Sequence, residues 1–115
     1  MPRSAPTTTL TLLPGTLDLL VLSVLMHTDH HAYALARAIE SASGGGVKIE
    51  EGSLYPCLKR LQSVGCVQAM WTIGPTGRRV RQYSITGSGR RAWATQHTLW
   101  LRFAAAVDSV VSTYT

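Results

Sequence analysis

Apolar residues in the first half of the chain recur every three or four positions, which is the spacing of one buried helix face. This pattern predicts three helices, over residues 16–27, 32–43 and 54–64. Thr16 and Ser53 are expected as N-caps of the first and third helices, and Gly65 as the residue that ends the third. Pro56 is expected within the first turn of the third helix, where its missing N–H costs nothing.

After Gly65 the apolar spacing changes to every second residue, which is typical of strands. Residues 67–73 and 80–85 are therefore predicted as two strands of a hairpin. The segment between them, residues 74–79, is rich in glycine and carries Arg78 and Arg79. The hairpin is thus expected to have a basic tip.

A last helix is predicted from a cap at Thr86 or Ser88 to about Ser112. At 1.5 Å per residue it would be about 38 Å long, more than a domain of this size can cover. Its apolar residues repeat every seven positions, as in helices that pair with another helix. Trp93, Trp100, Val107 and Tyr114 share one heptad position, and Phe103 and Val110 share the other.

The predicted fold is mainly α with a small β-hairpin, because three short helices come before two strands and a long helix. This order is that of a winged helix-turn-helix, in which the third helix enters the DNA major groove and the hairpin lies on the backbone. Three regions are expected: a flexible N-terminal arm over residues 1–13, the winged helix-turn-helix over 14–86, and a C-terminal dimerisation helix over 87–115. Val47 to Ile49 is expected as a short extended piece.

Charge supports a polyanionic partner. The 115 residues carry a net charge of +5, and residues 48–91 hold eight bases against two acids. A basic segment between neutral ones favours a patch that faces nucleic acid. The longest apolar run, residues 17–26, is shorter than the roughly 20 residues of a bilayer span and contains Asp18 and Ser23.

We expect a cytoplasmic location without membrane contact. Residues 1–13 lack the apolar core of a signal peptide. Cys57 and Cys66 have neither metal-ligand spacing nor a disulfide pattern, which fits packed thiols in a reducing compartment. Oxidation of Cys57 as a switch is the less favoured alternative.

Polar residues opposite the apolar stripe of the third helix form a surface that can donate to phosphates and base edges. Tyr55, Lys59 and Gln62 share one line of this surface. The full set is Ser53, Tyr55, Pro56, Lys59, Arg60, Gln62 and Ser63. An ordinary solvated helix face is the alternative, and the arginines of the hairpin tip favour the DNA interpretation.

Several motifs resemble the PadR family of bacterial transcriptional regulators, over about residues 12–92. The most specific is Glu51-Gly52-Ser53-Leu54-Tyr55-Pro56. The others are Leu13-Pro14-Gly15-Thr16-Leu17-Asp18, His31-Ala32-Tyr33, Leu58 with Arg60-Leu61, Gly77-Arg78-Arg79, Tyr83-Ser84-Ile85-Thr86 and Gly89-Arg90.

The resemblance implies a dimeric repressor of a palindromic operator, in the short form of the family with one C-terminal helix. It implies DNA contacts for Tyr33, Tyr55, Lys59, Arg78 and Arg79, and the third-helix surface adds Ser53. The sequence departs from the family pattern at Ala32, where glycine is frequent, and at Gln62, where an acid is frequent. With Ala32 in place of glycine, the conformation of the turn before the second helix can differ from the family's.

No enzyme, cofactor or metal site is expected. His27, Asp29, His30 and His31 lie across a helix end and a turn, which is a poor arrangement for metal ligands. The sequence contains no nucleophile triad and no phosphate-binding loop.

Trp93 and Trp100 are candidates for binding a flat aromatic effector, because residues seven apart lie on one side of a helix. The alternative is that both rings fill a dimer core, to which Phe103, Val107 and Val110 also belong. As a whole, the protein is expected to be a sequence-specific repressor relieved by an aromatic effector. The alternatives are a sequestering dimer with weak, non-specific DNA binding, and a non-specific architectural DNA binder.

Overall fold

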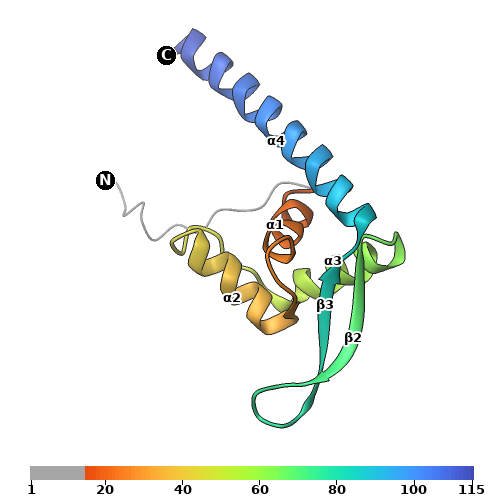
Figure 1. Cartoon of the computed structure of the whole chain (residues 1–115). Coiled ribbons are helices and arrows are strands. Elements are labelled where there is room, and N and C mark those ends of the chain that lie inside the picture. The colour runs from red at the N-terminus through yellow and green to blue at the C-terminus, as the bar shows by residue number, and fades with distance from the viewer. Residues whose placement is uncertain (1–14) are drawn as a thin grey trace.

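The computed structural model describes residues 15–115 as four helices and a small antiparallel sheet (Figure 1). The arm predicted over residues 1–13 lies outside the described residues. The helices are α1 (Thr16–Leu25), α2 (Ala32–Ala42), α3 (Glu51–Ser63) and α4 (Gly87–Tyr114), and the strands are β1 (His30–His31), β2 (Val67–Ile73) and β3 (Arg79–Ile85). The predicted winged helix-turn-helix is confirmed as the fold.

The core lies between α1, α2, α3 and the inner end of the sheet. Its fully buried side chains are Val21, Leu22, Leu25, Leu35, Leu54, Leu58 and Val67. Six of them come from α1, α2 and α3, whose apolar residues recur every three or four positions, and Val67 comes from β2, whose apolar residues alternate. The predicted cap Thr16 is wrong: the N-cap is Gly15, whose φ of +84° favours glycine.

The helix α3 begins at Glu51, two residues before the predicted cap Ser53. The amides of Ser53 and Leu54 both donate to the carbonyl of Glu50, so the chain is already helical at Ser53. Pro56 is therefore the sixth helical residue and not part of the first turn, as predicted. Gly65, with a φ of +82°, follows the helix in the left-handed conformation expected of a terminating glycine.

The sheet has the order β1, β3, β2, with both pairs antiparallel. The two long strands form the predicted hairpin, with Val67 opposite Ile85 and Ile73 opposite Arg79. The short strand β1 was not predicted, because His30 and His31 fall in a polar break and are extended only through pairing with β3. Val47 to Ile49 forms no strand, although the amide of Ile49 donates to Glu40 Oε2 at 3.1 Å.

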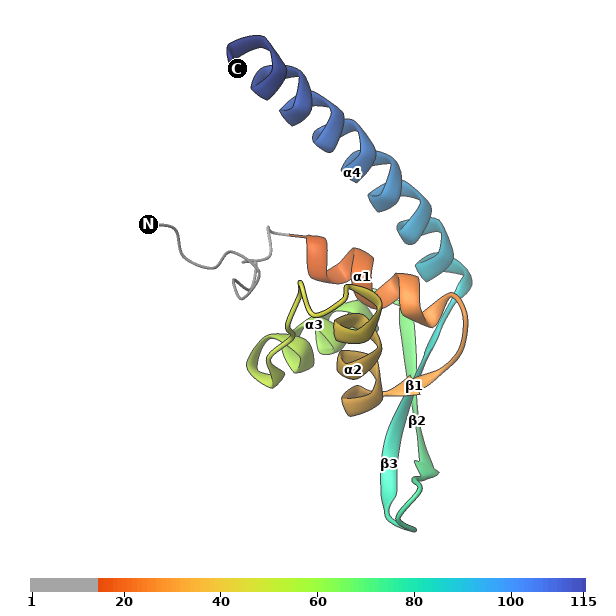
Figure 2. The ribbon, with the colours of Figure 1, turned by 90° about the vertical axis from the view of Figure 1, so that its left-hand side faces the viewer.

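The helix α4 is fastened to the domain at its first turn. Thr86 Oγ1 accepts from the Gly89 amide at 3.0 Å and donates to the Gly65 carbonyl at 2.6 Å, which confirms the cap predicted there. Gly89 is buried so closely that a Cβ atom on it would lie 2.1 Å from the Cys66 carbonyl oxygen. Figure 2 shows α4 leaving the domain at the end opposite to the hairpin.

None of the helices between Gly15 and Thr115 combines the length and the apolar character that a bilayer span requires.

Candidate nucleic-acid interface

One face of α3 is exposed along its length. Leu54, Cys57, Leu58 and Leu61 are buried on its other face. Three of the predicted contact residues, Ser53, Tyr55 and Lys59, are exposed, with half of the Tyr55 surface open to solvent. The structure therefore leaves these side chains free to meet another molecule.

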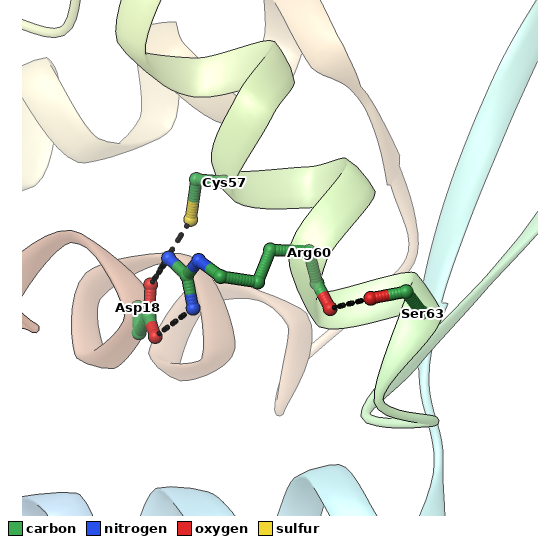
Figure 3. Close-up of polar contacts among 4 residues, drawn as sticks. All are labelled: Asp18, Cys57, Arg60 and Ser63. Carbon is green, nitrogen blue, oxygen red and sulfur yellow. Dashed lines mark hydrogen bonds and ion pairs between the residues drawn. The ribbon is translucent and has the colours of Figure 1, made fainter.

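Arg60 differs from its neighbours on that face. Its guanidinium donates to both carboxylate oxygens of Asp18 on α1, at 2.6 and 2.8 Å (Figure 3). These hydrogen bonds lower the pKa of Asp18 and raise the pKa of Arg60. Arg60 remains 56% exposed on the predicted surface, but its guanidinium is already bound by a carboxylate 42 positions earlier in the chain.

Cys57 completes this cluster. Its Sγ donates to Asp18 Oδ1 at 3.3 Å, and its side chain is buried (Figure 3). Burial and the neighbouring carboxylate raise the pKa of the thiol to about 12. Since the thiolate is the reactive form, Cys57 acts as a packed thiol at neutral pH, as the sequence indicated.

The outer half of the hairpin, which we call the wing, is residues 70–82. On the wing, Trp71 is 57% exposed and carries two arginines beside its ring. The Cζ atoms lie 4.6 Å from the ring centroid for Arg79 and 5.6 Å for Arg81. Arg78 is exposed in the turn next to them. The wing thus presents three guanidinium groups to solvent.

A cleft of about 300 Å³ separates the wing from the starts of α2 and α3. Tyr33 and Tyr55 line its helical side, and Trp71, Arg79 and Arg81 line its wing side. The structure thus brings Tyr33, Tyr55 and Arg79, three of the residues for which the resemblance implies DNA contacts, to one cleft. Ser53, Lys59 and Arg78 do not line the cleft.

Three residues of this region were missed by sequence reasoning. They are Trp71 and Arg81 on the wing, which line the cleft, and Arg37 on α2. Arg37 donates to the Tyr33 hydroxyl at 2.9 Å, and its guanidinium lies 5.6 Å from the Tyr33 ring centroid. The signal for Arg37 was its position, four residues after an exposed tyrosine on the same helix.

The two tryptophans of α4 have different surroundings. Trp93 Nε1 donates to Ser23 Oγ on α1 at 2.9 Å, and its ring stacks on His97 with centroids 5.0 Å apart. Trp100 is 40% exposed and lines an apolar groove of about 400 Å³ between α4 and the start of α1. Trp93 does not line this groove, so a single chain does not bring the two rings to one space.

The predicted dimerisation residues Phe103, Val107 and Val110 are all exposed on the outer turns of α4. Phe103 also lines the groove beside Trp100, at 6.4 Å between ring centroids. Within residues 15–115, no three His, Cys, Asp or Glu side chains lie together as a metal site requires.

Comparison with known proteins identifies relatives of this fold. The transcriptional regulator PadR-like family matches residues 21–95. The transcriptional regulator YqjI of Escherichia coli is 33% identical over 75 residues, which are 65% of this chain and 34% of YqjI.

Solved structures share the arrangement of the elements. A PadR family transcriptional regulator from Eggerthella lenta has a TM-score of 0.72 at 31% identity, covering 86% of this chain and 84% of its own. A transcriptional regulator from Clostridium thermocellum has the same fold, with a TM-score of 0.76 at 23% identity, covering 83% and 92%. With its exposed α3 face and basic wing, the chain belongs to the PadR-like family of transcriptional regulators.

Proposed function

We propose that this protein is a sequence-specific repressor that binds a palindromic operator as a homodimer and is released by a small aromatic effector. The observation that carries the proposal is the cleft between α3 and the wing, where Tyr33, Tyr55 and Arg79 meet. These are groups that donate to phosphates and base edges.

In this proposal α3 enters the major groove. Ser53, Tyr55 and Lys59 project from its exposed face, opposite the buried leucines. Arg78 and Arg79 on the wing contact the sugar-phosphate backbone and so fix the position of α3 on the duplex. The excess positive charge of residues 48–91 supports this arrangement, because neutralising phosphates supplies most of the sequence-independent affinity.

Dimerisation is assigned to the outer turns of α4. Phe103, Val107 and Val110 are 43% to 61% exposed and lie on one side of the helix. Soluble monomers seldom expose a contiguous apolar patch of this kind. Two copies paired about a two-fold axis would present two α3 helices, which is the arrangement that a palindromic site requires.

The effector site is assigned to the groove that Trp100 lines, with Phe103 and Leu99 beside it. Flat rings stack on exposed aromatic side chains, and a cationic ring adds cation–π attraction. Trp93 enters this site only if dimerisation brings it close to the partner's groove.

The alternative function is a sequestering dimer that binds aromatic molecules and has little affinity for DNA. The apolar groove at Trp100 favours it. The exposed guanidinium groups of the wing favour the regulator, since a sequestering protein has no use for them.

Selection from a random duplex library tests the regulator. The full chain is expected to enrich an inverted repeat whose half-sites lie about 34 Å apart. Titrations at one fixed salt concentration should then give tighter binding to the enriched duplex than to a scrambled one, typically by at least about 10³-fold. Enrichment of no sequence, or equal binding to both duplexes, would refute sequence-specific regulation.

Tryptophan emission tests the effector site, with quinoline as the first planar probe. Saturable quenching is expected in the wild type and absent in Trp100→Ala, whose dimer and operator affinity should persist. By linkage, a probe that weakens operator binding must itself bind the operator complex less tightly. Quenching that survives in Trp100→Ala would move the site elsewhere.

A further inference from the structure

Trp71 is an exposed ring with two arginine guanidinium groups beside it. We infer that Trp71 is a positioning residue: it holds Arg79 and Arg81 side by side as one paired cation site for the backbone phosphates of a DNA strand. The inference rests on the DNA binding proposed above. It adds Trp71 to the arginines of the wing as a residue on which the phosphate contact depends.

The hairpin register sets this arrangement. Trp71 on β2 lies directly opposite Arg81 on β3, and Arg79 is its diagonal neighbour. Because side chains alternate along a strand, all three project from the same face of the hairpin. Both guanidinium carbons lie within the roughly 6 Å range of a cation–π contact with the indole ring.

Core packing does not account for the tryptophan. Along the same face of β2, Val67 is 2% exposed, Trp71 is 57% exposed and Ile73 is 65% exposed. The apolar core therefore ends before Trp71. Because the Trp71 ring is largely exposed, burial contributes little to its stability. Its contacts with Arg79 and Arg81 are the aromatic interactions that the structure shows for it.

The paired cations have no acidic partner on the wing. Among residues 15–115, the ion pair within 4 Å is that of Asp18 with Arg60, which lies on the helices. Two neighbouring guanidinium groups repel each other, and the negative face of the indole offsets part of this repulsion. An anion offsets the rest, and guanidinium groups bind phosphate through two parallel hydrogen bonds.

The residues that line the cleft favour a DNA strand over a small ion as the anion. Across it from the paired cations stand Tyr33 and Tyr55, at the starts of α2 and α3. Their exposed hydroxyl groups can donate to further phosphate oxygens. A backbone that follows the cleft therefore meets the wing on one side and the helix proposed to read the major groove on the other.

The test compares Trp71→Phe, which keeps a ring, with Trp71→Leu, which keeps an apolar side chain without a π face. Met70→Ala is the matched control, because Met70 is 64% exposed on the same strand and faces the other side of the hairpin. Affinity for a random-sequence 30-base-pair duplex is measured at several salt concentrations, so that no operator is required.

We expect Trp71→Leu to bind about fivefold more weakly with a shallower salt dependence, and Trp71→Phe and Met70→Ala to stay within about twofold of wild type. Adding Arg79→Ala should cost less in the Trp71→Leu background than in the wild type, since the arginine has already lost its support. Melting temperatures of all variants identify any loss that comes from unfolding.

Equal affinity of wild type and Trp71→Leu would overturn the inference, and so would equal losses in the Phe and Leu variants. A wild type that binds every duplex alike would refute sequence-specific regulation and leave the inference standing. A wild type that binds no duplex at low salt would overturn both.

Discussion

The carboxylate of Asp18 on α1 accepts two hydrogen bonds from the guanidinium of Arg60 on α3, at 2.6 and 2.8 Å. The same carboxylate accepts from Cys57, one turn earlier on α3. A single side chain of α1 thereby contacts two successive turns of the helix that carries Tyr55 and Lys59 and adds to the core packing that orients it.

Asp18→Asn should lower the free energy of unfolding by about 1 kcal/mol at pH 7, a modest value because Arg60 is largely exposed. The pKa of Asp18 is lowered in the folded state, so its contribution is complete above its ordinary value of 3.8 and is lost as the pH falls through the lowered pKa. Urea unfolding at fixed protein concentration should show the two proteins converging in acid. Asp108→Asn, on an exposed turn of α4, is the control and should show no such difference.

Gly89→Ala should destabilise the protein by about 2–4 kcal/mol. The added Cβ would meet the Cys66 carbonyl oxygen at 2.1 Å and Ile85 Cγ1 at 2.7 Å, and the first of these is backbone. Gly87→Ala is the matched control, since its Cβ would meet only the Arg91 side chain at 3.7 Å. If both variants melt at the wild-type temperature, the backbone around Gly89 can shift to accommodate a Cβ atom without loss of stability, and the prediction is wrong.

Arg78→Ala and Arg79→Ala should each weaken binding to every duplex and reduce the log–log salt slope by about one. The reason is that an exposed guanidinium on the wing replaces one condensed counterion. Arg102→Ala removes an equal charge from α4 and should leave the slope unchanged. An unchanged slope in the wing variants would exclude the phosphate role.

Tyr55→Ala and Lys59→Ala should reduce affinity for the selected operator more than affinity for scrambled DNA. A side chain that reads a base edge or sets the register of α3 contributes about 1–3 kcal/mol at the correct site only. Parallel titrations of the two duplexes measure this difference, and Arg78→Ala, which should reduce both alike, is the reference. Equal losses would assign Tyr55 and Lys59 to backbone contacts.

Val107→Glu should convert the dimer into a monomer or an insoluble chain, because it places a charge within the exposed apolar stripe of α4. Ala105→Glu adds the same charge on the opposite side of the helix and should remain dimeric. Sedimentation velocity at micromolar concentration distinguishes the species. A wild type that sediments as a soluble monomer would rule out the dimer.

Sequence periodicity predicted the helices and the hairpin well, because each buried face is a local pattern. It missed β1, since His30 and His31 become extended only by pairing with Tyr83 and Gln82, more than 50 positions later. It also placed the start of α3 too late. Ser53 is a good capping residue, and the hydrogen bonds to Glu50 that begin the helix have no sequence signature.

The exposed polar residues of the candidate site were predictable from the sequence. The contacts that these residues make with other elements of the fold were not. Arg60 resembles Lys59 in sequence, yet its guanidinium is bound by Asp18 from another helix. Likewise, alternation along β2 places Val67 and Trp71 on one face without indicating where the core ends. Both distinctions depend on contacts between elements that are distant in the chain.

The rigid attachment of α4 at Thr86 and Gly89 also has a geometric consequence. The helix has 28 residues and is therefore about 42 Å long, so a tilt of 10° at the attachment would displace its far end by about 7 Å. In the proposed dimer that displacement is comparable to two base-pair steps. The close contact between Gly89 and the Cys66 carbonyl, together with the hydrogen bond from Trp93 to Ser23, opposes such a tilt. In the proposed dimer, contacts at the base of α4 would therefore control the distance between the two α3 helices.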